Sequence, residues 1–347
     1  MSDTKTLAAL GYRLPAEWEP HAATWLAWPH NRDTWPGKFE PIPAIWAEFV
    51  RTVSPFEPVH VLAAEGDVMR EARAMVGHLP GVTLHSIPTN DAWIRDHGPV
   101  FLAGPPERPP ALVDWEYNAW GGKYPPFDLD NLVPRRIAEA TGRRRFCPGI
   151  VLEGGAIDSN GQGTILAAED CLTDANRNPG LSKAEIQRYL ADYLGARRVV
   201  WIRGSIAGDD TDGHVDQLAR FVGPTTVVAA LERNPADENH AVLKENFESL
   251  QRTTDQEERP FEVIPLPMPQ PIHFQGRRLP ASYANFYIAN GLVVAPQFDD
   301  QADQEAAETL ARLFPDRKVC SLPAVDLAWG LGAYHCATRD EPADTAG

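Results

Sequence analysis

The chain has 347 residues, a formal net charge of −16 at pH 7 and 43% hydrophobic residues. Such a composition is typical of a folded globular protein and excludes a disordered one. The acidic balance argues against a nucleic-acid partner, because phosphates bind stripes of Lys and Arg, and it suits a cationic small molecule. Solubility alone also explains an acidic surface. No apolar run approaches the roughly 20 residues that span a bilayer, and the N-terminus lacks a signal-peptide pattern, so we expect no membrane partner.

Four cysteines are scattered along the chain without CxxC pairs. We therefore expect neither a thiolate zinc site nor a disulfide scaffold, and we expect a reducing, cytoplasmic compartment. The proline-rich stretches are short and lie between apolar runs, so we predict that they are rigid loops and not linkers between domains. We predict a single domain over residues 1–347, with short flexible ends at about 1–12 and 343–347.

Helices and strands alternate along the chain. A strand is predicted at 59–63 and a helix near 67–79. The next helix has Ser182 and Glu185 as a capping box, an apolar stripe, and Gly195 as its end. Further strands are predicted at 199–202, 226–230, 261–264, 292–295 and 318–321, with a helix near 304–314. This alternation indicates an α/β fold.

Five segments each place a polar or acidic residue beside glycine or another small residue in strand-like surroundings. Their candidate residues are Asp96, Glu153, His214, Asp216, Asn285 and Cys336. The segments recur at intervals of about 50 to 70 residues, which suggests a repeat around an axis with one residue per repeat facing the centre. An ordinary α/β sheet with loops of similar length explains the spacing equally well.

Cys336 is the candidate nucleophile. A lone cysteine is usually a small buried apolar residue, as we expect for Cys147, Cys171 and Cys320. Cys336 differs because glycines at 330 and 332 allow the backbone to turn sharply and polar residues flank it. Since the thiolate is the reactive form, a protonated His or a bound cation is needed nearby.

His214 and Asp216 are two residues apart, so in a strand they share one face. A His-x-Asp pair can also hold a metal, but further ligands at informative spacing are absent. Residues 209–213 resemble the start of a calcium loop without the glutamate that completes it. We therefore predict no metal.

The remaining candidates suit a cationic substrate. Glu153 is expected to be buried and to orient a His, whereas Asp96 could instead form a surface pair with Arg95. Two ionised carboxylates that converge on one pocket repel each other unless a cation lies between them, and a guanidinium can receive a forked hydrogen bond from each. Most tryptophans are expected in the core, with Trp93 as the candidate for lining the pocket.

Several segments, taken together and in order, resemble the agmatine deiminase family, which includes the bacterial type of peptidylarginine deiminase. They are LPAEWEPH at 14–21, NDAWIRDHGP at 90–99, DWEYNAWGG at 114–122, LEGG at 152–155, NRNP at 176–179, DGHVD at 212–216, ASYANFYIANG at 281–291 and HC at 335–336. The resemblance therefore covers nearly the whole chain.

The resemblance implies an α/β pentein fold, a five-bladed propeller with a pseudo-fivefold repeat around a central active site. It also implies hydrolysis of agmatine to N-carbamoylputrescine and ammonia, a step of putrescine biosynthesis and polyamine metabolism, without metal or cofactor. By motif match Cys336 is the nucleophile, His214 the general acid and base, and Glu153 its assistant. Asp96 and Asp216 hold the guanidinium, and Trp93 and Asn285 complete the substrate site. A homo-oligomer is compatible with the chain.

The sequence departs from the family pattern close to Cys336. Residues 330–334 read GLGAY where the family has GGGNI, Arg339 and Asp340 replace a Gln-rich stretch, and Asp212 replaces an Asn. We expect Leu331, Ala333, Tyr334 and Arg339 to shape the pocket mouth. Arg339 leaves open a peptidylarginine or other guanidine deiminase, since a cation suits a substrate carboxylate. A catalytically inactive guanidinium-binding protein and a cysteine peptidase are the alternatives outside this chemistry.

Overall fold

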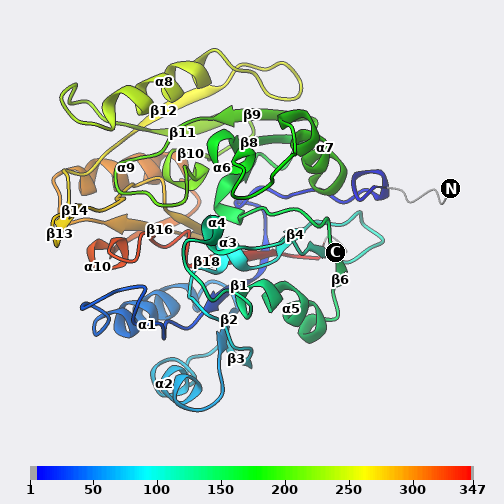
Figure 1. Cartoon of the computed structure of the whole chain (residues 1–347), viewed down its shortest axis with the longest axis vertical. Coiled ribbons are helices and arrows are strands. Elements are labelled where there is room, and N and C mark those ends of the chain that lie inside the picture. The colour runs from blue at the N-terminus through cyan, green and yellow to red at the C-terminus, as the bar shows by residue number, and fades with distance from the viewer. Residues whose placement is uncertain (1–5, 345–347) are drawn as a thin grey trace.

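The computed structural model describes residues 6–344, and it is built from five small sheets that share one pattern (Figure 1). In each, the first strand runs antiparallel to the second, and the second runs parallel to the third. Three of these sheets are β4 (Val100–Leu102), β5 (Ala111–Val113) and β6 (Arg144–Phe146); β7 (Ile157–Ser159), β8 (Thr164–Ala168) and β9 (Arg198–Ile202); and β10 (Ala219–Phe221), β11 (Thr226–Leu231) and β12 (Glu262–Pro267).

The other two sheets complete the set. One consists of β15 (Tyr287–Ala289), β16 (Leu292–Gln297) and β17 (Lys318–Pro323). The other joins the two ends of the chain, because the last strand pairs with the first: β18 (Thr338–Pro342), β1 (His21–Ala27), β2 (Val59–Ala63) and β3 (Val82–Ser86). A two-stranded hairpin, β13 (His273–Phe274) and β14 (Arg277–Arg278), lies outside this pattern.

Helices connect the parallel strands, as the crossover between parallel neighbours requires. They are α1 (Ile42–Val53), α2 (Asp67–Met75), α4 (Ala119–Gly122), α5 (Val133–Thr141), α6 (Glu169–Thr173), α7 (Lys183–Leu194), α8 (His240–Gln251) and α9 (Ala302–Leu313). The short helices α3 (Ile94–His97) and α10 (Val325–Ala328) precede the first strands of two sheets. In Figure 1, α3, α4 and β18 lie near the middle of the molecule, and α2, α5, α7 and α8 lie toward its outside.

Local sequence signals account for several of these elements. Helix α7 begins at a capping box of Ser182 and Glu185 and ends at Gly195 in the left-handed conformation, as predicted. The predicted strand at 59–63 coincides with β2, and each of the other predicted strands overlaps an observed one. Within residues 6–344 no helix is long and apolar enough to cross a bilayer.

Buried aromatic residues form much of the core. Trp35, Trp46 and Trp93 pack against one another, with ring centroids 5.3 to 5.8 Å apart. The expected flexible ends include residues 1–5 and 345–347, which lie outside the described residues. Within the expected N-terminal end, Leu7 and Tyr12 are buried in a second core cluster, so this part is packed against the protein body.

Candidate active site

The predicted site residues all lie in the turns that lead into the first strand of a sheet. Asp96 is in α3 before β4, and Glu153 precedes the 3₁₀ turn Gly154–Ala156 before β7. His214 and Asp216 flank the start of the 3₁₀ turn Val215–Gln217 before β10, and Asn285 and Cys336 precede β15 and β18. Five chain segments thus contribute from equivalent positions, which is the physical origin of their regular spacing.

The prediction that His214 and Asp216 share the face of a strand is wrong. Val215 and Asp216 belong to a 3₁₀ turn, and His214 is its extended N-cap. The two side chains nevertheless converge on Gly155, since a Cβ atom there would lie 2.5 Å from His214 Nδ1 and 3.1 Å from Asp216 Oδ2. The turn provides the convergence that we had assigned to strand alternation.

A cavity of about 680 Å³ opens at this cluster. Asp96, Cys336 and Trp93 line it, together with Tyr117 and Trp120. Asp96 is only 4% exposed and Cys336 only 6%, so both lie at the buried end of the cavity. The alternative of an Asp96–Arg95 surface pair is therefore wrong.

Asp96 is held from two sides. Its Oδ1 accepts a hydrogen bond from the backbone N–H of Gly155 at 2.9 Å, and its Oδ2 accepts one from Trp120 Nε1 at 3.0 Å. Burial raises the pKa of Asp96, although the nearby His214 opposes this effect. An ionised Asp96 is therefore poorly compensated by the protein alone and is suited to a cationic ligand.

His214 is buried between two acidic groups. Its Nε2 lies 2.9 Å from Glu153 Oε2, and its Nδ1 lies 3.6 Å from Asp96 Oδ1. Burial alone would lower the pKa of His214, but Asp96, Cys171 and Glu153 together raise it well above its usual value. These acidic neighbours therefore favour the imidazolium form of His214. Among the described residues its Nδ1 has no hydrogen-bond partner, which leaves one N–H free for a ligand.

Glu153 is held by an arginine for which we had predicted no role. Arg177 donates from Nε to Glu153 Oε1 at 2.6 Å and from Nη2 to Oε2 at 3.2 Å. Burial would raise the pKa of Glu153, but His214 and Arg177 lower it, so the carboxylate stays ionised beside the imidazolium. Arg177 lies in the quoted NRNP motif, and that motif was the signal available for it.

Asp216 is held by a second histidine. His335 Nδ1 lies 2.7 Å from Asp216 Oδ2, and His335 Nε2 lies 2.9 Å from Glu17 Oε2. Burial would raise the pKa of Asp216, but the contact with His335 lowers it. The other oxygen, Oδ1, is buried and has no hydrogen-bond partner within residues 6–344.

Cys336 faces these groups. Its Sγ is 3.5 Å from Asp216 Oδ2 and receives a hydrogen bond from Asn285 Nδ2 at 3.1 Å. Burial, followed by the charges of Asp216 and Asp96, raises the pKa of Cys336 well above its usual value. These surroundings therefore favour the thiol form of Cys336. We had predicted that Asn285 lines the substrate space. Asn285 is instead fully buried, contacts the sulfur, and is not among the residues that line the cavity.

Gly155 shows how closely three site residues approach the backbone. A Cβ atom at this position would lie 2.5 Å from His214 Nδ1, 2.8 Å from Asp96 Oδ1 and 3.1 Å from Asp216 Oδ2. A side chain here would displace His214 and Asp96 and crowd Asp216. Glycine therefore allows the three groups to converge, and the sequence marked it only as part of the LEGG motif.

The departures near Cys336 lie in different places. Leu331 lines the large cavity, as expected, with φ at +69°. Ala333 and Tyr334 are buried, and Tyr334 stacks on Phe49 instead of reaching the mouth. Arg339 is 4% exposed and lines a separate cavity of about 30 Å³. The expectation that Tyr334 and Arg339 shape the pocket mouth is wrong, because both are packed away from it.

Comparison with known proteins decides the family. The model of the Porphyromonas-type peptidyl-arginine deiminase family matches residues 13–342. The chain belongs to this family. A curated relative, the agmatine deiminase of Pseudomonas aeruginosa, is 38% identical over 363 residues, covering 98% of this chain and 98% of the relative. The resemblance to agmatine deiminases stated from the sequence is thereby confirmed.

Solved structures agree with the family assignment. The agmatine deiminase of Enterococcus faecalis superposes with a TM-score of 0.91 at 31% identity, covering 98% of both chains. The agmatine deiminase of C. jejuni with substrate bound gives a TM-score of 0.88 at 30% identity and covers 96% of this chain and 97% of that one. A dimethylarginine dimethylaminohydrolase shares the fold alone, with a TM-score of 0.52 at 12% identity. The chain has the pentein α/β fold.

Proposed function

We propose that this chain hydrolyses agmatine to N-carbamoylputrescine and ammonia through a covalent intermediate on Cys336. The observation that carries the proposal is that Asp96 and Cys336 both line the large cavity at its buried end, and that Asp216 Oδ2 lies 3.5 Å from Cys336 Sγ. Two carboxylates and one thiol at the end of such a cavity suit a planar cation whose central carbon is attacked. Membership of a deiminase family supports a hydrolase that acts on C–N bonds of amidines.

Substrate binding follows from the charges. The guanidinium lies between Asp96 and Asp216, which accept its N–H groups and orient its carbon toward Cys336 Sγ. The bound cation offsets the two carboxylate charges that raise the pKa of Cys336, so the thiol releases its proton to solvent when the substrate binds. The substrate thus contributes to the activation of its own nucleophile.

The chemistry proceeds in two halves. The Cys336 thiolate attacks the guanidinium carbon, His214 donates a proton to one nitrogen, and ammonia leaves. The product of this half is a thiouronium joined to the sulfur. A water molecule then gives one proton to His214 and attacks the same carbon. The carbon–sulfur bond breaks as the urea product forms, and the second water proton passes to the sulfur, which restores the Cys336 thiol. Glu153 stabilises the imidazolium in both halves through its contact with Nε2.

A peptidylarginine or other guanidine deiminase is the second candidate. Arg32 and Arg277 line the large cavity and suit a substrate carboxylate, while Asp33, Asp91 and Asp210 line it too and suit the distal amine of agmatine. Ammonia release from agmatine, free arginine and arginine peptides separates the two candidates. Agmatine is expected to give the highest kcat/KM, and equal or greater rates with arginine peptides would contradict the proposal. If no guanidine releases ammonia although agmatine binds, the inactive binding protein is the correct alternative.

Four further predictions accompany this proposal. We propose that the five sheets are blades of one propeller around the site, and that the chain forms a single domain. The shared strand pattern and the equivalent positions of the site residues support both. We also propose a cytoplasmic location and association of copies of the chain, and sedimentation measurements on the purified protein test the association.

A further inference from the structure

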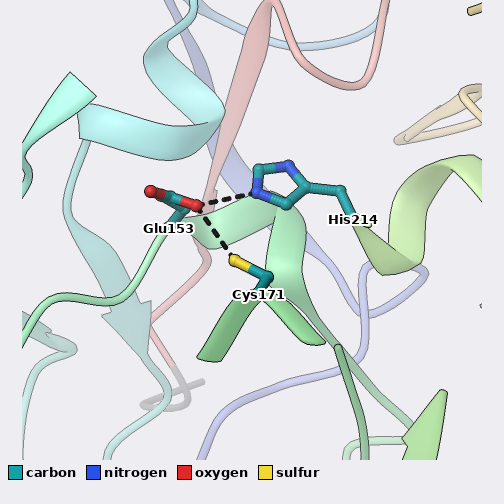
Figure 2. A group of neighbouring side chains, drawn as sticks. All are labelled: Glu153, Cys171 and His214. Carbon is teal, nitrogen blue, oxygen red and sulfur yellow. Dashed lines mark hydrogen bonds and ion pairs between the residues drawn. The ribbon is translucent and has the colours of Figure 1, made fainter. Parts of the chain in front are cut away.

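Glu153, Cys171 and His214 form a compact group of donor atoms behind the catalytic centre (Figure 2). Glu153 Oε2 lies 2.9 Å from His214 Nε2 and 3.2 Å from Cys171 Sγ. One ligand atom from each residue lies within 4.8 Å of the other two, and all three residues are buried. They come from three separate segments, since Cys171 belongs to α6 and the others precede β7 and β10.

Cys171 has no part in the proposed reaction. It is fully buried, it does not line the large cavity, and its sulfur faces the carboxylate of Glu153. The sequence alone suggested an inert core cysteine. A thiol, an imidazole and a carboxylate in contact are, however, the donor types that bind Zn²⁺.

We propose that Glu153, Cys171 and His214 are an inhibitory zinc-binding site. Zinc binds sulfur, imidazole nitrogen and carboxylate oxygen at roughly 2.0 to 2.3 Å, so its ligand atoms lie roughly 3 to 4 Å apart. Two edges of this triangle, 2.9 and 3.2 Å, are already close to that range, and the third is within 4.8 Å. Small side-chain movements therefore suffice to build three of the four positions of a tetrahedral site.

Zinc binding at this group is expected to release protons. Zn²⁺ binds a thiolate and a neutral imidazole, so the metal takes the place of protons on Cys171 and on His214 Nε2. Arg177 keeps its 2.6 Å contact with Glu153 Oε1 and gives up only its 3.2 Å contact with Oε2.

Occupation of this site stops the reaction proposed above. A metal on His214 Nε2 holds the imidazole neutral and separates it from Glu153, so His214 no longer supplies the proton that lets ammonia leave. Because the group is buried, the metal enters slowly, and inhibition is expected to develop during preincubation.

The activity test measures, for each protein separately, the ratio of the rates with and without Zn²⁺. A substitution that changes only the basal rate therefore does not change this ratio. Wild type preincubated with zinc is expected to lose activity by about tenfold or more, as saturation of a tight site requires, and to recover when a chelator is added. The activity of Cys171→Ser and of Cys171→Ala is expected to fall by less than about twofold when zinc is added, because neither side chain supplies a thiolate. Cys320→Ala, at a half-buried cysteine elsewhere, is the matched control and should keep full sensitivity.

A binding measurement separates this proposal from the proposed function. Co²⁺ bound through a thiolate gives a sulfur-to-metal charge-transfer band, which needs no turnover. Cys336→Ala is expected to keep the band and Cys171→Ala to lose it. A band that disappears in Cys336→Ala and persists in Cys171→Ala would place the metal on the nucleophile and overturn the proposal, as would wild type that shows neither band nor inhibition. A band with no deimination of any guanidine would uphold the metal site and refute the proposed function.

Discussion

The carboxylates on the two sides of the catalytic centre have different partners. On the cavity side, Asp96 has no arginine partner, and Asp216 keeps one buried oxygen without a hydrogen bond among the described residues. On the rear side, Glu17 contacts Arg95 and Arg220, and Asp340 contacts Arg95. The rear carboxylates are compensated within the protein. Asp96 and Asp216 contact the histidines His214 and His335 instead. We therefore expect the rear carboxylates to serve stability and the cavity-side carboxylates to bind a cationic substrate.

The largest expected effect is on the cavity side. Asp96→Asn removes a charge that the bound guanidinium needs, so kcat/KM for agmatine is expected to fall by about 10³-fold or more. The free energy of unfolding should stay the same or rise, because burial disfavours the ionised carboxylate in the free protein. Steady-state kinetics and denaturant unfolding measure the two quantities. Near-normal activity, or a large loss of stability, would contradict the assignment of Asp96 to substrate binding.

The rear side should respond in the opposite way. Arg220 is fully buried and lies 2.9 Å from Glu17 Oε1 and 3.3 Å from Asp158 Oδ1. Arg220→Met leaves both carboxylates without this partner and is expected to lower the free energy of unfolding by about 3 to 5 kcal/mol. Arg233→Met is the control, since Arg233 pairs with Glu305 at the surface and its loss should cost less than about 1 kcal/mol. Equal effects of the two substitutions in denaturant unfolding would refute the distinction.

A smaller effect on the rear side depends on pH. Burial would raise the pKa of Asp340, but Arg95 and Arg339 lower it to about 2. A carboxylate with a lowered pKa stabilises the fold above its unfolded pKa and loses this contribution as the pH falls through about 2. Asp340→Asn should therefore be less stable than wild type by roughly 2 kcal/mol above pH 4, and the difference should vanish near pH 2. A difference that is constant with pH would show that packing, and not charge, is lost.

Asn285 lies where the two sides meet and is expected to give the smallest effect. Its side chain donates to Cys336 Sγ and accepts from the backbone N–H of His335 at 3.1 Å. Asn285→Ala is expected to lower kcat about tenfold with little change in KM, because one hydrogen bond to the sulfur is lost and the cavity wall is unchanged. Asn246→Ala is the control. The amide side chain that this variant loses contacts the backbone of Arg203, so the free energy of unfolding should change and kcat should not. A rise in KM for Asn285→Ala would return this residue to the substrate site.

The sequence predicted the elements that depend on neighbouring residues. Helix α7 was predictable because Ser182, Glu185 and Gly195 are local signals, and the strands were predictable from short apolar runs. Contacts between distant segments were not. His335 pairs with Glu17, which lies 318 residues away, and no local pattern reveals such a partner. The site residues were found through motifs, but the direction in which Arg339 and Tyr334 point depends on tertiary packing.

The central claim is that Cys336, and not the buried Cys171, carries the covalent intermediate. Acid quenching during turnover of agmatine traps a thiouronium, and mass spectrometry of the digested protein locates it. The account predicts that the peptide containing Cys336 carries an added mass equal to that of agmatine minus ammonia. In His214→Gln the amount of this adduct should increase if the second half-reaction is slowed more than the first. An adduct on Cys171, or ammonia release with no adduct on Cys336 at any quench time, would contradict it.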